Sequence, residues 1–181
     1  MIEVEVKAWV HDFRDIKRKL DKIGAKKIKT EHQEDTYFNA PHRDFAKTDE
    51  ALRIRKTSND KTQRIFITYK GPKIDKVSKT RKEVEVGVEN AENAAQILEN
   101  LGFHPVATIR KIRDVYFLDE FVISLDDVHM IGNFVEIEKE IKEGKSFNKI
   151  VNEILKIYKK LGITEGFERR SYLELLGVYK S

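Results

Sequence analysis

Three short runs with alternating Glu are the part of this sequence that could do chemistry. They are Glu3-Val4-Glu5-Val6-Lys7, Glu83-Val84-Glu85-Val86 and Glu136-Ile137-Glu138. Side chains alternate between the two faces of a strand, so both Glu of each run share one face, roughly 7 Å apart. Carboxylates at that spacing repel each other unless a cation lies between them. A divalent cation could be bound by both.

Alternation also predicts which other charged side chains lie on the same faces. Besides the acids of the three runs, these are Lys7, Arg53, Arg55, Lys70, Arg81, Lys111, Arg113 and Asp126. Acids and bases are sorted by strand, whereas paired charges on a solvated face would mix the signs along each strand. A solvated face remains the alternative for any single strand. Together the strands favour a charged cavity, in which carboxylates bind Mg²⁺ or Mn²⁺ and Arg or Lys bind phosphate oxygens.

The composition limits the other classes of function. The chain has 181 residues, 40% of them hydrophobic, which suits a single domain over residues 1–181 or at most two small ones. The absence of Cys excludes disulfides, thiolate metal sites and Cys nucleophiles. A net charge of +4 without a block of Lys and Arg allows an anionic ligand but disfavours nucleic acid. Because no apolar run could span a membrane and a strand is expected from Ile2, we expect a cytoplasmic protein.

The hydrophobic periodicity predicts three helices among eight strands. The helices are expected near 12–23, 90–101 and 146–161, behind Asp12, Asn90 and Ser146, each ending at a Gly. The strands are expected at 2–9, 28–38, 51–57, 63–70, 79–88, 106–118, 121–128 and 133–141. A mobile Lys-rich loop is expected at 71–79.

A weak internal repeat accompanies this order of elements. Asp35–Phe38 and Asp114–Phe117 share the pattern Asp-x-Tyr-Phe, and a degenerate third unit ends near Tyr172. The repeat suggests a closed or nearly closed antiparallel sheet with helices packed outside it. An open sheet fits the same pattern.

The ordered set of motifs resembles the CYTH superfamily, which groups class IV adenylyl cyclases, thiamine triphosphatases and other triphosphate tunnel metalloenzymes. The motifs are Glu-x-Glu-x-Lys from Glu3, Asp35-Thr-Tyr-Phe, Leu52-Arg-Ile-Arg, Thr68-Tyr-Lys-Gly, Arg81-Lys-Glu-Val-Glu, Leu125-Asp-Asp-Val and Gly132-Asn-Phe-Val-Glu-Ile-Glu. The resemblance covers nearly the whole chain. It implies an α+β fold: an antiparallel eight-stranded β-barrel tunnel with flanking helices, which holds a triphosphate and divalent cations.

The resemblance also implies roles for individual residues. The expected metal ligands are Glu3, Glu5, Glu136 and Glu138. The expected triphosphate contacts are Lys7, Arg53, Arg55, Lys70, Arg81, Lys111 and Arg113. Asp126 is expected to help with metal or water, Tyr37 and Lys70 to position the attacking water, and Glu83 and Glu85 to be tunnel acids. A packed aromatic side chain is the alternative for Tyr37.

Three functions remain open for such a tunnel: hydrolysis of tripolyphosphate, a nucleoside triphosphate or thiamine triphosphate; cyclisation of ATP; and binding without catalysis. The bacterial cyclases carry a His-Phe pair shortly before Glu-x-Glu-x-Lys, and here only Met1 and Ile2 precede Glu3. This difference favours hydrolysis. A homodimer is left open.

Overall fold

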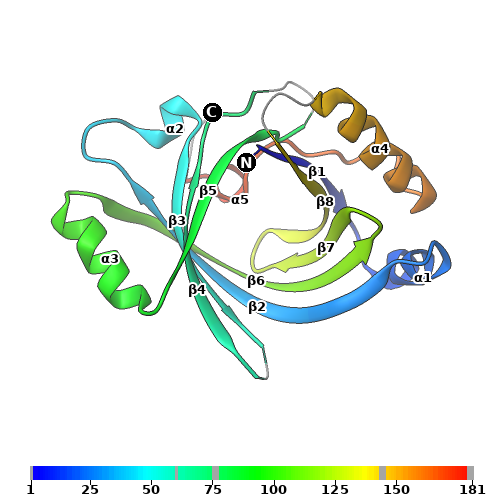
Figure 1. The fold of residues 1–181 in the computed structure, drawn as a ribbon, viewed down its shortest axis with the longest axis horizontal. Helices are drawn as coiled ribbons and strands as arrows, with labels where there is room; N and C mark the ends of the chain where they lie inside the picture. Colours follow the sequence, from blue (N-terminus) through cyan, green and yellow to red (C-terminus); the bar gives the residue numbers. More distant parts are fainter. Residues whose placement is uncertain (1, 60, 75–77, 143–145, 179–181) are drawn as a thin grey trace.

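The computed structural model describes residues 2–59, 61–74, 78–142 and 146–178 of the chain, and its strands form a closed barrel (Figure 1). The elements are β1 (Ile2–Val10), α1 (Arg14–Lys22), β2 (Lys26–Asn39), α2 (Phe45–Thr48), β3 (Ala51–Ser58), β4 (Gln63–Lys70), β5 (Arg81–Val88), α3 (Ala91–Asn100), β6 (His104–Leu118), β7 (Phe121–Val128), β8 (Gly132–Ile141), α4 (Phe147–Lys160) and α5 (Tyr172–Leu175). The predicted eight-stranded antiparallel barrel with flanking helices is confirmed. Residues 75–77 of the predicted mobile loop lie outside the described residues.

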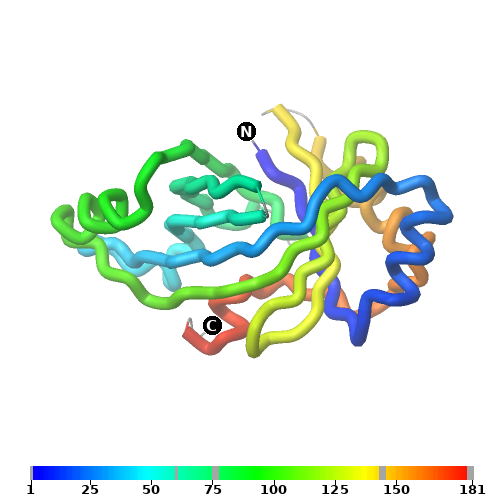
Figure 2. The backbone as a smooth tube through the Cα atoms, turned by 90° about the horizontal axis from the view of Figure 1, so that it is seen from below, coloured from blue at the N-terminus to red at the C-terminus, as the bar shows by residue number. Residues whose placement is uncertain are grey.

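The strands follow the order β1-β5-β4-β3-β2-β6-β7-β8 around the barrel, and every neighbouring pair is antiparallel. The long strands β2 and β6 run side by side along the molecule (Figure 2). Figure 1 shows α1 and α4 on one side of the barrel and α3 on the opposite side. Helices therefore cover part of the outer surface of the barrel, while Val84 and Val86 of β5 stay exposed, and the charged faces of the strands point to the interior.

The edge of β1 that faces β5 is completed by loop segments. Among the described residues, β1 pairs with β5 only through Ile2 and Glu3. Farther along β1, Glu5 O accepts a hydrogen bond from Lys79 N at 2.8 Å, and Trp9 N donates one to Gly166 O, also at 2.8 Å. Gly166 has φ +79°, and a Cβ there would lie 3.0 Å from Trp9 O, so a glycine suits this close approach. The barrel is thus sealed by the 78–80 and 166–168 segments where β5 has diverged.

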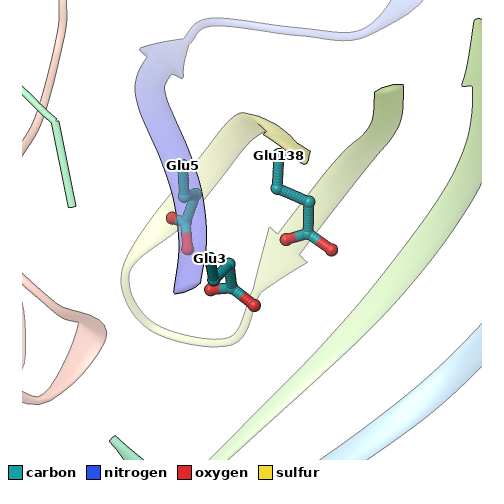
Figure 3. Close-up of side chains that lie close together, drawn as sticks. All are labelled: Glu3, Glu5 and Glu138. Carbon is teal, nitrogen blue, oxygen red and sulfur yellow. The ribbon is translucent and has the colours of Figure 1, made fainter. Parts of the chain in front are cut away.

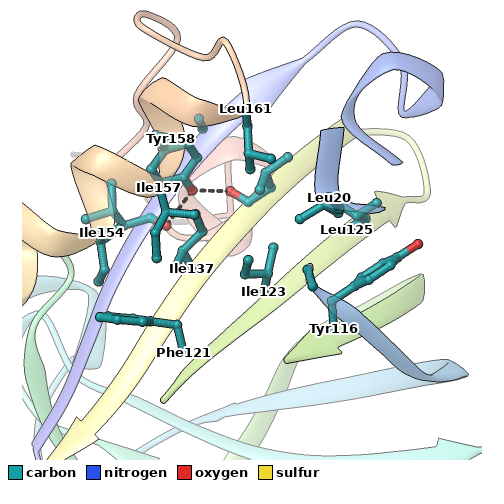
Figure 4. Close-up of a cluster of buried hydrophobic side chains, with 14 of the residues drawn as sticks. Leu20, Tyr116, Phe121, Ile123, Leu125, Ile137, Ile154, Ile157, Tyr158 and Leu161 are labelled. Carbon is teal, nitrogen blue, oxygen red and sulfur yellow. Dashed lines mark hydrogen bonds between the residues drawn. The ribbon is translucent and has the colours of Figure 1, made fainter. Parts of the chain in front are cut away.

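The main hydrophobic core lies between the barrel and the helices α1 and α4 (Figure 4). Ile154 and Tyr158 of α4 are fully buried against β1 and β8. The Tyr158 hydroxyl lies 2.7 Å from Val6 O and 2.8 Å from Val135 O, so its polar end is satisfied inside the core. The periodic stripe that predicted this helix is therefore its buried face.

The predicted helix starts are only partly confirmed. The Asn90 side chain accepts a hydrogen bond from Asn93 N at 2.7 Å, as expected of an N-cap. Asp12 lies one residue too early: α1 starts at Arg14 with Phe13 as its cap residue, although Asp12 still accepts a hydrogen bond from Arg14 N. Ser146 stands at the cap position of α4 but makes no side-chain cap hydrogen bond.

The two Asp-x-Tyr-Phe segments of the repeat face opposite ways. Asp35 is buried in the barrel interior beside Arg53 and Arg55. Asp114 instead pairs with Lys17 of α1 and Lys27, outside the barrel. The repeat therefore matches the order of the elements but not the direction of the side chains.

Candidate functional site

The barrel encloses a cavity of about 580 Å³ that brings together charged side chains from most of the strands. Its lining includes the following predicted site residues: Glu3, Glu5, Tyr37, Arg53, Arg55, Lys70, Arg81, Glu83, Glu85, Lys111, Arg113, Glu136 and Glu138. Lys7 and Asp126 are the predicted site residues that do not line it. Residues of α2 and α5, among them Phe45 and Leu173, line it as well.

Three carboxylates form a cluster on the β1–β8 side of the cavity (Figure 3). Glu3 and Glu5 come from β1, and Glu138 lies directly opposite Glu5 on β8. Oxygens of the three side chains lie within 4.8 Å of one another. The strand register thus brings together the first and last Glu-x-Glu runs of the sequence.

The charge of this cluster is poorly compensated. Burial and the neighbouring Glu3 raise the pKa of Glu138 to about 8. Burial and Glu136 also raise the pKa of Glu5. Within the described part of the chain, Glu138 forms no ion pair, whereas Glu3 lies 3.4 Å from Lys70. Carboxylate oxygens without nitrogen or sulfur ligands suit a hard divalent cation, so the residues fit Mg²⁺ or Mn²⁺.

Glu136, the fourth predicted metal ligand, lies in a different environment. Its carboxylate pairs with Arg113 and lies 3.7 Å from Lys79. Burial alone would raise the pKa of Glu136, but Lys79 and Arg113 together hold it well below its usual value. The third Glu-x-Glu run, on β8, is therefore split, because Glu138 belongs to the acid cluster and Glu136 to a set of ion pairs.

Two arginines on β3 surround a single carboxylate on β2. Arg55 makes two hydrogen bonds of 2.6 Å to Asp35, and Arg53 makes a third of 3.4 Å. Burial opposes ionisation of Asp35, but Arg55 and Arg53 outweigh it, so the pKa of Asp35 is lowered. Asp35 thus fixes both guanidinium groups at the cavity wall. The sequence placed Asp35 in the repeat and in one motif of the family resemblance but assigned it no role.

The β6–β7 wall holds two more cations in the same way. Asp126 is completely buried and accepts hydrogen bonds from Lys111, at 2.8 Å, and from Arg113, at 2.6 Å. The Tyr172 hydroxyl of α5 donates a further hydrogen bond of 2.9 Å to Asp126. Alternation placed Asp126 on the inner face correctly, but it lies behind Lys111 and Arg113. In this structure it holds these cations rather than facing the cavity.

Lys7 also lies behind the wall, because the C-terminal segment covers it. Its side chain is 1% exposed, and its Nζ donates a 2.6 Å hydrogen bond to Arg170 O. The same Nζ lies 4.1 Å from the centre of the Tyr172 ring. Burial and Lys79 lower the pKa of Lys7 to about 7. The expected contact with a triphosphate is therefore not open to Lys7 as the segment lies here.

Lys70 and the acids of β5 form the remaining wall. Lys70 contacts Glu83 and lies 3.4 Å from Glu3. Glu85, which is more exposed, accepts a 2.7 Å hydrogen bond from the buried Thr68. Tyr37 lies opposite Arg53 on the neighbouring strand, while Lys70 is engaged with Glu3 and Glu83. Tyr37 and Lys70 thus line one cavity but have different partners.

Arg81 is a buried residue of the cavity lining. Its guanidinium lies 3.8 Å from Asp49, the residue after α2. Lys79, two residues before Arg81, also lines the cavity and contacts Glu5, and it was not among the predicted site residues. Extending the alternation from Arg81 by one step towards the N-terminus would have found it, since Lys79 and Arg81 share a face.

A closed barrel with an acid cluster on one wall and fixed Arg and Lys side chains on the others defines a triphosphate tunnel protein. The chain belongs to the CYTH domain family, whose model matches residues 1–172. Proteins of this family bind triphosphate substrates such as ATP and depend on divalent metal ions. No helix in the described part of the chain is long and apolar enough to cross a membrane.

Relatives and solved structures agree with this assignment. A candidate adenylate cyclase of Methanocaldococcus jannaschii is 48% identical over 98% of this chain and all of its own length. The solved structure of the PH1819 protein from Pyrococcus horikoshii has a TM-score of 0.90 and 43% identity, covering 96% of this chain and 97% of its own. A Hippeastrum protein shares the fold, with a TM-score of 0.66 at 18% identity, over 97% of this chain and 94% of its own. Its structure is described as that of a candidate adenylyl cyclase with a dominant triphosphatase activity.

Proposed function

We propose that the protein hydrolyses a triphosphate bound in the barrel cavity together with a divalent cation. One observation carries the proposal: a cluster of three carboxylates, of which Glu138 forms no ion pair among the described residues, shares a cavity of about 580 Å³ with several fixed cationic side chains. Acids that outnumber their cations on one wall, and cations that outnumber their acids on the others, together match a metal–polyphosphate complex. The Hippeastrum protein, with its dominant triphosphatase activity, supports hydrolysis over other reactions.

In this proposal Glu3, Glu5 and Glu138 hold the cation, which would neutralise charge on the phosphate oxygens. Arg53, Arg55, Lys111 and Arg113 bind and orient the phosphate chain and stabilise charge that develops on the leaving group. A P–O bond forms between water and the terminal phosphorus while the bridging P–O bond breaks, the electron pair of the broken bond leaves with the diphosphate, and a proton of the water passes to solvent. Lys70 and Tyr37 are proposed to orient the water.

Asp35 and Asp126 act in this scheme as positioning residues. Each accepts hydrogen bonds from two cationic side chains of the cavity wall. A guanidinium that is held in place before the substrate binds loses less conformational entropy on binding. We therefore assign Asp126 to the orientation of Lys111 and Arg113.

The test is the release of phosphate from tripolyphosphate, ATP and thiamine triphosphate, with Mg²⁺ and with Mn²⁺. We expect phosphate as product and a loss of at least about 100-fold in kcat for Glu5→Gln, because a ligand of the cation is removed. The matched control is Glu34→Gln, which changes an acid on the outside of the barrel that pairs with Arg110. Full activity in a folded Glu5→Gln variant would contradict the assignment.

Cyclisation of ATP is the second candidate, and the similarity to the Methanocaldococcus jannaschii protein favours it. The same cavity would then place a ribose hydroxyl, instead of water, against the α-phosphorus. The products separate the two reactions, because a cyclase yields cyclic AMP and pyrophosphate. Tight binding of tripolyphosphate in calorimetry without any product would identify a binding protein.

A further inference from the structure

Lys79 is a cation fixed between the acid cluster and the ion-paired wall. Its backbone N donates a 2.8 Å hydrogen bond to Glu5 O, which anchors it to the edge of β1. Ser78 and Thr80 on either side are 1% and 0% exposed, and their hydroxyl oxygens lie 2.5 Å apart. The buried neighbours Ser78 and Thr80 and the hydrogen bond to β1 therefore hold the side chain of Lys79 at the cavity.

The ammonium group of Lys79 contacts Glu5 Oε1 and lies 3.7 Å from Glu136 Oε1. Glu5 is also a member of the cluster with Glu3 and Glu138. One carboxylate is thus shared between an internal cation and the group of acids that suits a divalent cation. Two cations that share a carboxylate in a poorly solvated cavity repel each other, so each weakens the binding of the other.

The same ammonium has the opposite effect on an anion. Lys79 lines the cavity together with Arg53, Arg81 and Arg113, so a polyphosphate in that space would gain from its charge. Lysine suits this dual role, because its ammonium is a point charge on a flexible stem with no fixed bidentate geometry.

We propose that Lys79 shifts the two affinities of the cavity in opposite directions: it weakens the binding of a free divalent cation and strengthens the binding of polyphosphate. The cavity then favours a metal that arrives together with the polyphosphate over a free metal ion. Lys79 is by this account a binding residue that discriminates between the free metal and the metal–polyphosphate complex. The predicted effect on polyphosphate affinity rests on the proposed function, whereas the predicted effect on the affinity for a free divalent cation does not.

The test uses isothermal calorimetry on the full chain with two probes. Titration with Mn²⁺ alone should give about tenfold tighter binding for Lys79→Met than for the wild type, within the usual range of coupling between two ligands. Titration with tripolyphosphate at saturating Mn²⁺ should give about tenfold weaker binding for the same variant. Lys79→Arg keeps the charge and should stay close to the wild type in both titrations.

The matched control is Lys73→Met. Lys73 lies in the same connection between β4 and β5, but its ammonium pairs with Asp49 and lies 3.9 Å from Glu174, away from the acid cluster. This variant should leave the Mn²⁺ affinity unchanged. If Lys79→Met does not fold, as judged by circular dichroism, Lys79→Gln removes the charge and keeps a polar end.

Unchanged or weaker Mn²⁺ binding in a folded, uncharged variant at position 79 would overturn the inference. If such a variant keeps wild-type Mn²⁺ affinity while the wild type releases phosphate, the inference fails and the proposed function stands. If the wild type binds tripolyphosphate without turnover while the two affinities still shift in opposite directions, the proposed function fails and the inference stands.

Discussion

The two sides of the barrel treat buried carboxylates in opposite ways. On the β2–β3 and β6–β7 sides, Asp35 and Asp126 each contact two cationic side chains, and both pKa values are lowered. On the β1–β8 side, Glu5 and Glu138 lie among other acids, and both pKa values are raised. In the first arrangement each acid is paired with cationic side chains. The second retains unbalanced negative charge, and this is where capacity to bind a cation remains.

The largest effect on stability should come from removing a carboxylate that is paired with cations, on the β6–β7 side. Asp126→Asn leaves Lys111 and Arg113 buried without their shared carboxylate, although Arg113 keeps Glu136. We expect the free energy of unfolding in urea to fall by about 3 kcal/mol, the usual cost of breaking a buried ion pair on one side. Asp127→Asn is the control, because the next residue is exposed. A loss as small as that of the control would show that Asp126 does not balance these cations.

A smaller effect, an increase in stability, should come from neutralising an acid of the cluster on the β1–β8 side. The pKa of Glu138 is about 8 in the folded chain against 4.5 as its usual value, so the folded state binds this proton more tightly than the unfolded state does. The wild type, kept free of metal with a chelator, therefore loses stability as the pH rises from about 4.5 to about 8. Glu138→Gln removes this loss.

We expect Glu138→Gln to be more stable than the wild type by on the order of 2 kcal/mol at pH 9, about half of what the full pKa difference would give because Glu138 is only half-buried, and almost equal to it at pH 4.5. Thermal unfolding at a series of pH values measures the difference. The exposed acid Glu99 on α3 supplies the control, since Glu99→Gln should change stability little at either pH. A variant that is less stable than the wild type at pH 9 would mean that the cluster is compensated after all.

The smallest effect should come from Thr68 on β4, an uncharged residue that links Arg53 to Glu85. Thr68 is fully buried, accepts a 3.4 Å hydrogen bond from Arg53 and donates one of 2.7 Å to Glu85. Thr68→Val removes both and leaves Arg53 with Asp35, so we expect a loss of about 1 kcal/mol in urea unfolding. Thr36→Val, which removes a hydroxyl contact on the exposed outer face, should cost less. Equal losses would indicate that Thr68 contributes only packing.

Much of the fold could be predicted from local pattern, because alternation and the 3.6-residue period each act within a single element. The eight predicted strands and three longer helices are present within a few residues of their expected bounds. The helices α2 and α5 were not predicted, since four residues are too few to show a period. Closure of the barrel was implied by the family resemblance, as the residues alone also allowed an open sheet.

The sequence by itself determined which side chains share the inner face of the barrel, since the pleat of a strand is fixed by its own backbone. Glu5, Arg53 and Arg113 lie on that face because of alternation alone. Only the tertiary structure decided which of these residues reach the cavity and which charges are balanced. Lys7 and Asp126 are covered by segments distant in the sequence, and Lys79 joins the cavity because its segment completes an edge of β1. The physical reason is that a charge buried in a cavity depends on its neighbours in space, and strand register and loop closure bring those neighbours together.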